Sequence, residues 1–401
     1  MLLFCRWYND KCSSRFGEKS IVNFLSIFSL ILLVYLIISL IWWMPVSRKV
    51  KTLLFLFFLL ISQKYSLYQI FGTGAFNPSL PSGWMMLGEA CYNVFLILLT
   101  LLVIKDFVWW IARGLQKLGM TIAWPLTSLQ LKCLLIGLSV LAGPWGVYCA
   151  LKVPDVKTVE IRITHLDPAF DGYRIVHLTD LHIGQLLKRP WLEQVVVKTN
   201  ALEADLILIT GDMVEGNARK LHEEVAPYGW LRARDGVMAV TGNHEHYHGG
   251  VDWVARFEAM GIAMLENRHR TIRRGEAKLV VAGAADRAAA RFGLPGPNVT
   301  TAIQNAPNVP VILMSHQPKG AEQLKGIDLQ LSGHTHGGLI KWIQPLIALF
   351  NGGFVDGLYR ANERTQVYVN PGTGLWTGMA CRIGVPSEIT QIVLRRDRPP
   401  F

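Results

Sequence analysis

Five short groups of Asp, Asn and His residues follow one another through the second half of the chain. In order they are Asp180-Leu181-His182, Gly211-Asp212, Gly242-Asn243-His244-Glu245, His316 and Gly333-His334-Thr335-His336. Carboxylate, amide and imidazole groups suit divalent metals such as Mn²⁺, Fe²⁺ and Zn²⁺. Any one group alone is more often structural than functional, because single strand-end histidines usually form hydrogen bonds. The ordered set of five indicates one shared metal site.

Each group stands at the end of a short apolar segment that is typical of a buried strand. These segments are residues 173–180, 204–212, 236–245, 309–316 and 327–336. Helical patterns lie between several of them, one beginning at Pro190 and another at Val251, and this alternation predicts an α/β domain. Ligands collect at the carboxyl ends of strands in such sheets. We therefore expect the five groups to converge in space.

A change in composition predicts two domains, residues 1–152 and 153–401. Directly after the change, Val159, Ile161 and Ile163 alternate with polar residues, as in a half-buried strand. Residues 1–150 carry 12 Lys and Arg against 4 Asp and Glu, whereas residues 151–401 carry 28 against 25. The positive excess therefore accompanies the apolar half, which argues against nucleic-acid binding as the main function.

The apolar half predicts a membrane region with about four transmembrane helices, because roughly 20 apolar residues cross a bilayer. The predicted spans are residues 21–44, 52–71, 87–111 and 133–151. Lys64 lies in the second span and does not exclude it, because a Lys near a helix end can extend its side chain to the interface. In the third span, the pair Lys105–Asp106 could line a polar path, but we favour a span that ends near Ile104 with Trp109 and Trp110 at the interface.

Basic residues between the spans predict the orientation of the chain. The loops at 45–51 and 112–132 each hold three Lys or Arg, and the loop at 72–90 holds none. This pattern predicts an integral membrane protein with the second domain on the outer face. The basic residues before residue 20 oppose that orientation. Only Cys381 lies in residues 153–401, so that domain has no cysteine pair for a disulfide or zinc.

The ordered groups resemble the calcineurin-like metallophosphoesterase superfamily, in particular its bacterial YkuE-like or YaeI-like branch. The run from Gly333 to Gly338 and the tract 368–390 are similar to that branch, and the resemblance covers residues 153–401. It implies a four-layer α/β/β/α sandwich, preceded here by the α-helical membrane region, with a dinuclear centre at the strand ends. Leu339 stands where many relatives carry Gln, which concerns substrate contacts and no metal ligand.

The resemblance also implies a role for each site residue. Asp212 would bridge two divalent ions, Mn²⁺, Fe²⁺ or Zn²⁺. The remaining implied ligands are Asp180, His182 and His336 for the first ion and Asn243, His316 and His334 for the second. His244 would bind the phosphate or protonate the leaving oxygen, with a purely supporting role as the alternative. Two carboxylates against four positive charges leave about two positive charges, which favours a phosphate substrate and a bridging hydroxide that attacks phosphorus.

These features predict hydrolysis of a phosphodiester, phosphomonoester or pyrophosphate, and the membrane region makes a lipid-linked substrate and membrane lipids plausible partners. One alternative is a catalytically silent membrane receptor or scaffold, which the complete ligand set disfavours. A transporter is the other alternative, and short spans with few charges give it little support. The oligomeric state is not determined by the sequence.

Two further features carry open expectations. We expect His246 and His248 to be solvated loop residues, with substrate contact as the alternative, and His177 to be a buried strand residue. Residues 337–359 are strongly apolar for a loop. Residues such as Trp342 and Leu346 could enter lipid beside the site or pack as ordinary core, and the sequence favours neither.

Overall fold

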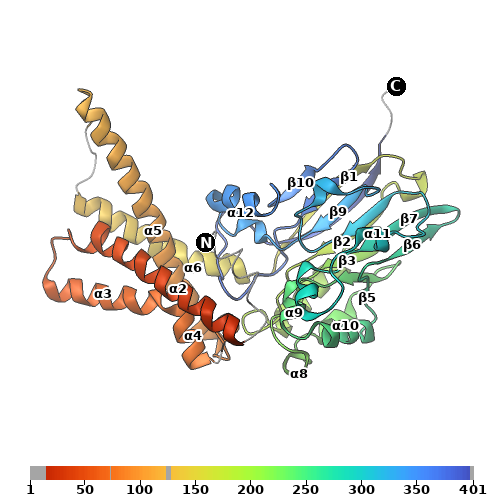
Figure 1. The fold of residues 1–401 in the computed structure, drawn as a ribbon, viewed down its shortest axis with the longest axis horizontal. Helices are drawn as coiled ribbons and strands as arrows, with labels where there is room; N and C mark the ends of the chain where they lie inside the picture. The colour runs from red at the N-terminus through yellow and green to blue at the C-terminus, as the bar shows by residue number, and fades with distance from the viewer. Residues whose placement is uncertain (1–14, 73, 123–127, 398–401) are drawn as a thin grey trace. The chain divides into compact units, whose positions relative to one another are not determined.

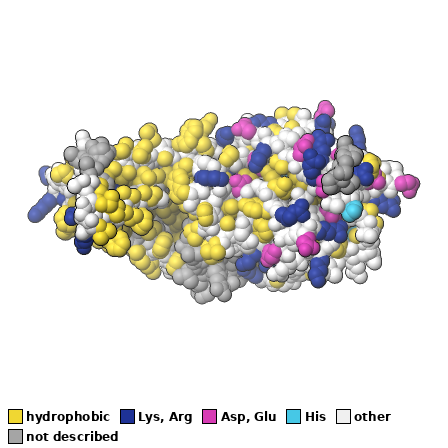
Figure 2. Space-filling model, turned by 90° about the horizontal axis from the view of Figure 1, so that it is seen from above, with side chains coloured by type: hydrophobic (Ala, Val, Ile, Leu, Met, Phe, Trp, Pro, Cys, Tyr) yellow, Lys and Arg dark blue, Asp and Glu magenta, His cyan; other side chains and the backbone are white. Residues whose placement is uncertain are grey.

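The computed structural model describes residues 15–72, 74–122 and 128–397. The chain divides into two compact units, Met1–Tyr148 and Cys149–Phe401 (Figure 1). The first unit is helical and the second is built on β-sheets. Figure 2 shows hydrophobic side chains over most of the visible surface of the helical unit, whereas Lys, Arg, Asp and Glu gather over the other unit.

The helical unit contains three helices that are long and apolar enough to cross a membrane, among the residues described: Val22–Ile41, Ser82–Lys117 and Ser128–Leu151. The helices are α2 (Arg15–Leu36), the π-helical η1 (Ile37–Ile41), α3 (Arg48–Ser62), α4 (Lys64–Gly72), α5 (Ser82–Lys117) and α6 (Ser128–Leu151). Helices α3 and α4 bend by 62° at their junction and together could form a fourth span or a re-entrant segment. The predicted span over 52–71 lies within this bent pair and stays a prediction.

The ion pairs Lys64–Glu89 and Lys105–Asp106 lie within the helical unit. Lys64 is buried, and its Nζ lies 2.9 Å from Oε1 of the buried Glu89. The attraction between the two charges offsets part of the cost of removing each of them from water. The helix also continues through Lys105 and Asp106, where Tyr35 donates a hydrogen bond of 2.6 Å to Asp106. This polar contact joins α5 to α2. The span end predicted near Ile104 stays a prediction, because a helix can continue beyond the part that crosses the bilayer.

The second unit contains two six-stranded sheets. The first has the order β1-β12-β2-β3-β4-β5, with β2 to β5 parallel, β12 antiparallel to β2, and β1 parallel to β12. Its strands are β1 (Asp155–Ile163), β2 (Arg174–Leu178), β3 (Leu206–Thr210), β4 (Val237–Val240), β5 (Ala263–Met264) and β12 (Glu388–Arg396).

The second sheet has the order β10-β11-β9-β8-β7-β6, in which β7, β8, β9 and β11 are parallel and the two edge strands are antiparallel to their neighbours. Its strands are β6 (Arg268–Arg274), β7 (Ala277–Gly283), β8 (Val311–Met314), β9 (Leu329–Ser332), β10 (Gly357–Arg360) and β11 (Gln366–Val369).

The two sheets pack face to face, with side chains such as Leu208, Val281 and Leu331 buried between them. Helices cover the outer faces. The outer elements are α7 (Arg189–Asn200), α8 (Ala218–Leu221), η3 (Ala226–Trp230), α9 (Asn243–Tyr247) and α10 (Gly250–Ala259), then η4 (Arg287–Phe292), α11 (Val299–Ala302), η5 (Ala321–Gln323) and α12 (Gln344–Phe350). The predicted four-layer α/β/β/α sandwich is confirmed.

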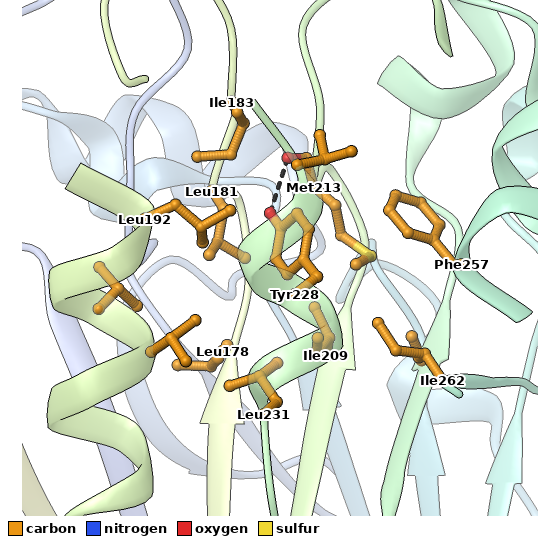
Figure 3. Close-up of a cluster of buried hydrophobic side chains, with 14 of the residues drawn as sticks. Leu178, Leu181, Ile183, Leu192, Ile209, Met213, Tyr228, Leu231, Phe257 and Ile262 are labelled. Atoms are coloured by element: carbon orange, nitrogen blue, oxygen red, sulfur yellow. Dashed lines mark hydrogen bonds between the residues drawn. The ribbon is translucent and has the colours of Figure 1, made fainter. Parts of the chain in front are cut away.

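The core outside the first sheet holds the loops that carry the candidate site (Figure 3). Leu181 and Met213 are fully buried there, and each is the immediate neighbour of a predicted ligand. The hydroxyl of Tyr228 donates a 2.9 Å hydrogen bond to the carbonyl of Met213. Close packing therefore fixes the backbone directly beside His182 and Asp212.

Candidate metal centre

All seven predicted ligands lie just beyond the carboxyl ends of parallel strands. They follow β2 (Asp180, His182), β3 (Asp212), β4 (Asn243), β8 (His316) and β9 (His334, His336). Backbone hydrogen bonds join these strand ends: the amide of Asp180 donates to Gly211, and that of Gly333 donates to His316. Five groups that are far apart in the sequence are thereby brought to one edge of the sandwich, as expected for ligands in such sheets.

The glycines of the motifs allow this close approach. A Cβ on Gly242 would lie 2.2 Å from Oδ1 of Asp212, and one on Gly333 would lie 2.1 Å from Oδ2 of Asp180. No real side chain tolerates such distances, so both positions require glycine next to a carboxylate.

The first cluster consists of Asp180, His182 and His336, whose candidate ligand atoms all lie within 4.8 Å of one another. Oδ1 of Asp180 is 3.5 Å from Nε2 of His336 and 3.8 Å from Nε2 of His182. Carboxylate and imidazole atoms at such separations can share one cation as ligands.

The second cluster consists of Asp212, His316 and His334. Oδ2 of Asp212 lies 3.0 Å from Nε2 of His316 and also 3.7 Å from Nε2 of His182 in the first cluster. One carboxylate oxygen therefore faces both clusters, which is the position that a bridging carboxylate needs.

Asn243 begins α9 beside this second cluster. The amide of the next residue, His244, donates a 2.9 Å hydrogen bond to Oδ1 of Asp212. Oδ1 of Asn243 is buried and accepts no hydrogen bond from the described residues, and Nε2 of His182 is equally without a partner there. Buried polar atoms normally have partners. These two atoms, Oδ1 of Asn243 and Nε2 of His182, lack hydrogen-bond partners in the described part of the chain and are therefore suited to bind divalent cations.

The backbone at the site is strained. Five of the seven predicted ligands have a positive φ: Asp180 (52°), His182 (46°), Asp212 (50°), His334 (70°) and His336 (49°). Residues other than glycine adopt this conformation rarely, at a cost of about 1 kcal/mol or more each, and such residues concentrate at functional sites. The surrounding fold must therefore stabilise this rare backbone conformation at the predicted ligands.

Burial and neighbouring carboxylates shift the pKa values of the site histidines in opposite directions. Burial alone would lower the pKa of His182, but Asp180 and Glu215 raise it to about 10. By contrast, burial lowers the pKa of His334 to about 4 and that of His336 to about 3. These two rings are therefore neutral at pH 7, as metal ligands must be. The carboxylates around His182 favour positive charge at the site.

Glu215 is a site residue that the sequence analysis missed. Its buried carboxylate lies 3.0 Å from Nδ1 of His182, 2.8 Å from Nδ1 of His244 and 3.1 Å from Nε2 of His248. Nothing in the strand pattern marks it, because it lies in the loop after β3, but its place three residues after Asp212 could have suggested it. Glu215 orients the two histidines so that their Nε2 atoms point away from it.

The expectation that His246 and His248 are solvated is wrong for His246, whereas the side chain of His248 is 25% exposed. His246 is buried, with Nε2 3.0 Å from Oγ1 of Thr241, and His248 contacts Glu215. His246 is buried because its ring stacks on that of Phe292 in η4. The expectation for His177 is confirmed, since it is buried in β2 and lies 2.8 Å from Oγ1 of Thr210.

A further buried side chain, that of Glu245, connects two loops of the candidate site. The carboxylate of Glu245 accepts hydrogen bonds from the amides of Asp212 (3.0 Å), Met213 (2.7 Å) and Gly242 (2.7 Å). It thereby joins the loop after β3 to the loop after β4. Buried amides left without such an acceptor would destabilise both loops.

Arg382 holds the loop between β11 and β12. Its guanidinium donates hydrogen bonds to the carbonyls of Pro371 (2.7 Å) and Gly374 (2.9 Å), and the side chain is almost fully buried. The same loop brings the ring of Trp376 to 6.2 Å from that of His244. The tract 368–390 therefore forms one wall of the candidate centre.

A two-sheet sandwich with Asp, Asn and His at its strand ends defines the metallophosphoesterase class. The family model of calcineurin-like phosphoesterases matches residues 173–338. The Danio rerio transmembrane protein with metallophosphoesterase domain is 34% identical over 330 residues, which cover 78% of this chain and 74% of that protein. The chain belongs to the calcineurin-like metallophosphoesterase family.

Bacterial relatives extend the same comparison. A Campylobacter jejuni metallophosphoesterase is 34% identical over 267 residues, covering 65% of this chain and 68% of that protein. The Bacillus subtilis metallophosphoesterase YkuE is 28% identical over 265 residues, covering 63% and 90%. The predicted superfamily and the likeness to YkuE are confirmed. Apolar helices here and a relative named as a transmembrane protein together indicate a membrane protein.

Proposed function

We propose that the chain is a membrane-anchored phosphoester hydrolase that uses two divalent metal ions. The observation that carries this proposal is the position of Asp212, whose Oδ2 faces His182 in one cluster and His316 in the other. In this proposal residues 153–401 are the catalytic domain, and residues 1–152 anchor it with about four spans.

The donor set fits borderline divalent ions such as Mn²⁺, Fe²⁺ or Zn²⁺. Asp180, His182 and His336 would hold one ion, Asn243, His316 and His334 the other, and Asp212 both. Bound together, the two ions would supply positive charge to the phosphoryl oxygens and would make water a stronger nucleophile. Neutral Asn243 in place of a third carboxylate preserves that positive charge for an anionic substrate.

His244 is the group that we propose to transfer a proton to the leaving oxygen. Glu215, 2.8 Å from its Nδ1, raises its pKa together with Asp212 against the opposing effect of burial. A raised pKa keeps the ring protonated and its Nε2 able to donate. The ring of Trp376 lies beside that of His244, with 6.2 Å between their centroids.

The substrate is a phosphodiester, phosphomonoester or pyrophosphate, and the anchor supports one that is linked to a lipid. The basic residues near the spans support a catalytic domain on the outer face of a bacterial cell membrane. Protease treatment of intact spheroplasts tests this orientation. Cleavage within residues 153–401 is expected, and full protection until lysis would contradict it.

Hydrolysis of bis- and mono-p-nitrophenyl phosphate by the full chain in detergent, with added Mn²⁺, tests the catalytic proposal. We expect metal-dependent turnover that Asp212→Ala reduces by at least about a hundredfold, because the shared ligand is lost. Asp252→Ala, at an exposed position on α10, is the matched control and should retain wild-type rates. Metal-independent rates that are equal in all three proteins would contradict the proposal and favour a catalytically silent receptor.

A further inference from the structure

A short apolar segment follows the last predicted ligands and stays exposed. It comprises η7 (Lys341–Ile343) and α12 (Gln344–Phe350). Trp342 is 51% exposed and Leu349 is 72% exposed. The side chains of Ile343, Leu346, Ile347 and Phe350 are half-buried. The segment therefore does not pack as ordinary core, which was one of the two expectations for it.

The segment is held firmly against the candidate centre. Nε2 of Gln344 donates a 2.9 Å hydrogen bond to the carbonyl of Gly337, next to His336. The amide of Lys341 donates to the carbonyl of Ile383 at 2.9 Å. The exposed side chains thus belong to an ordered surface that adjoins the site.

The chain enters the catalytic unit at this same edge. β1 begins at Asp155, opposite Glu388 at the beginning of β12. Because β12 runs antiparallel to β2, its beginning lies beside the end of β2, where Asp180 and His182 follow. The entry point and the predicted ligands therefore share one edge of the first sheet.

The last turn of α6 packs at that edge. Ala150 is buried in a small cluster with Leu375 and Ala380, and Leu339 packs against the same cluster. Leu339 is two residues before Lys341, and Leu375 precedes Trp376 of the site wall. The end of the last candidate span therefore lies close to both the exposed segment and the site.

Chain length limits the distance between the span and the sheet. Only residues 152–154 separate α6 from β1, and three residues reach about 10 Å at most. A helix that crosses a bilayer ends at the lipid–water interface. The edge that carries the site must then lie at about the depth of the lipid headgroups.

We propose that residues 341–350 dock onto the lipid bilayer, with Trp342 and Leu349 inserted at the interface. Tryptophan is enriched at that depth, and Lys341, the only charged residue of the segment, suits anionic headgroups. The inference rests on the proposed anchoring of residues 1–152 in a membrane but not on catalysis. It places the opening of the site at the membrane surface.

Photo-crosslinking tests the docking without any measurement of activity. The full chain is reconstituted into vesicles of phosphatidylcholine and phosphatidylglycerol that contain a diazirine-bearing phosphatidylcholine, and adducts are mapped by mass spectrometry. We expect adducts on the peptide containing residues 341–350 as well as on the spans. Adducts confined to the spans would overturn the proposal.

A pair of variants gives the second readout. Trp342→Glu/Leu349→Glu should abolish adducts at 341–350 and most turnover of a vesicle-borne phosphodiester lipid, while turnover of soluble bis-p-nitrophenyl phosphate persists. Trp230→Glu/Val197→Glu charges a comparably exposed Trp and aliphatic residue on η3 and α7, and should change neither. Equal losses on both substrates would overturn the proposal. If wild type hydrolyses neither substrate, the proposed catalysis fails, and the adducts still decide the docking.

Discussion

At the scale of single residues, Glu215 decides how two histidines are oriented. One buried carboxylate contacts Nδ1 of both His182 and His244, so each ring presents Nε2 to the site. Mutation of a carboxylate that orients a metal-binding histidine commonly lowers metal affinity or activity by about 10- to 100-fold. Glu215 acts through these rings and is a positioning residue.

We predict that Glu215→Gln lowers kcat about 10- to 100-fold and shifts the alkaline limb of the kcat pH profile to lower pH, because His244 loses the charge that raises its pKa and gives up its proton at a lower pH. Steady-state kinetics from pH 5 to 9 and metal titration measure both effects. Glu223→Gln, at an exposed position, is the control. An unchanged pH profile with a lower rate would indicate a merely structural role.

A second residue, Glu266, links stability to pH. Desolvation by burial raises its pKa to about 7, against hydrogen bonds from Thr241 that lower it. A carboxyl with a raised folded pKa favours the folded state most below about pH 4.5, and this contribution declines as pH rises to about 7.

Glu266→Gln should therefore leave the unfolding temperature at pH 5 nearly unchanged and raise it at pH 8. The expected gain in the free energy of unfolding at pH 8 is about 1–2 kcal/mol. This is less than the full pKa shift implies, because the side chain of Glu266 is only half-buried. Thermal unfolding of the full chain in detergent at both pH values measures this, with Glu258→Gln as the exposed control. A variant that is less stable than wild type at pH 8 would contradict the assignment.

The predicted ligands were accessible to sequence reasoning because motif glycines and strand-end positions mark them. Other residues of the site were not accessible. Glu215 lies in a loop without periodicity. The burial of His246 depends on a tertiary contact with Phe292, which is distant in the sequence. The positive φ values of Asp180 and Asp212 run against local preference, so only the surrounding fold determines them.

At the scale of elements, the loop between β11 and β12 depends on Arg382. We predict that Arg382→Met destabilises the protein by about 3 kcal/mol or more, because the carbonyls of Pro371 and Gly374 lose their buried donor. Arg395→Met removes a largely exposed pair with Glu160 and should destabilise the protein far less, because water screens such pairs. Thermal unfolding compares the two, and equal losses would contradict the role of Arg382.

The elements that the sequence predicted are those with a continuous apolar run or a clean alternation. Strands β1 to β4, β8 and β9 all occur within or beside their predicted segments. β6 was missed because it is an Arg-rich edge strand with a single buried side chain. The bend between α3 and α4 was missed because the Lys64–Glu89 pair that accompanies it is a tertiary contact.

At the scale of the whole molecule, metal binding should stabilise the catalytic unit alone. We predict that chelation increases hydrogen exchange at residues 179–183, 211–216, 242–248 and 333–338, since bound ions would offset their strained and charged arrangement. Exchange in α5, which belongs to the helical unit, should not change. Mass spectrometry of the chain with and without EDTA measures this. If hydrogen exchange in the four segments is the same with and without EDTA, the result would contradict a metal site there.

The most direct test of the account is anomalous X-ray diffraction at the manganese edge from crystals of the full chain grown with Mn²⁺. The account predicts two peaks, one bonded to Asp180, His182 and His336 and the other to Asn243, His316 and His334. Asp212 should bond to both. A single peak, or two peaks that lie beyond bonding distance of Asp212, would contradict it.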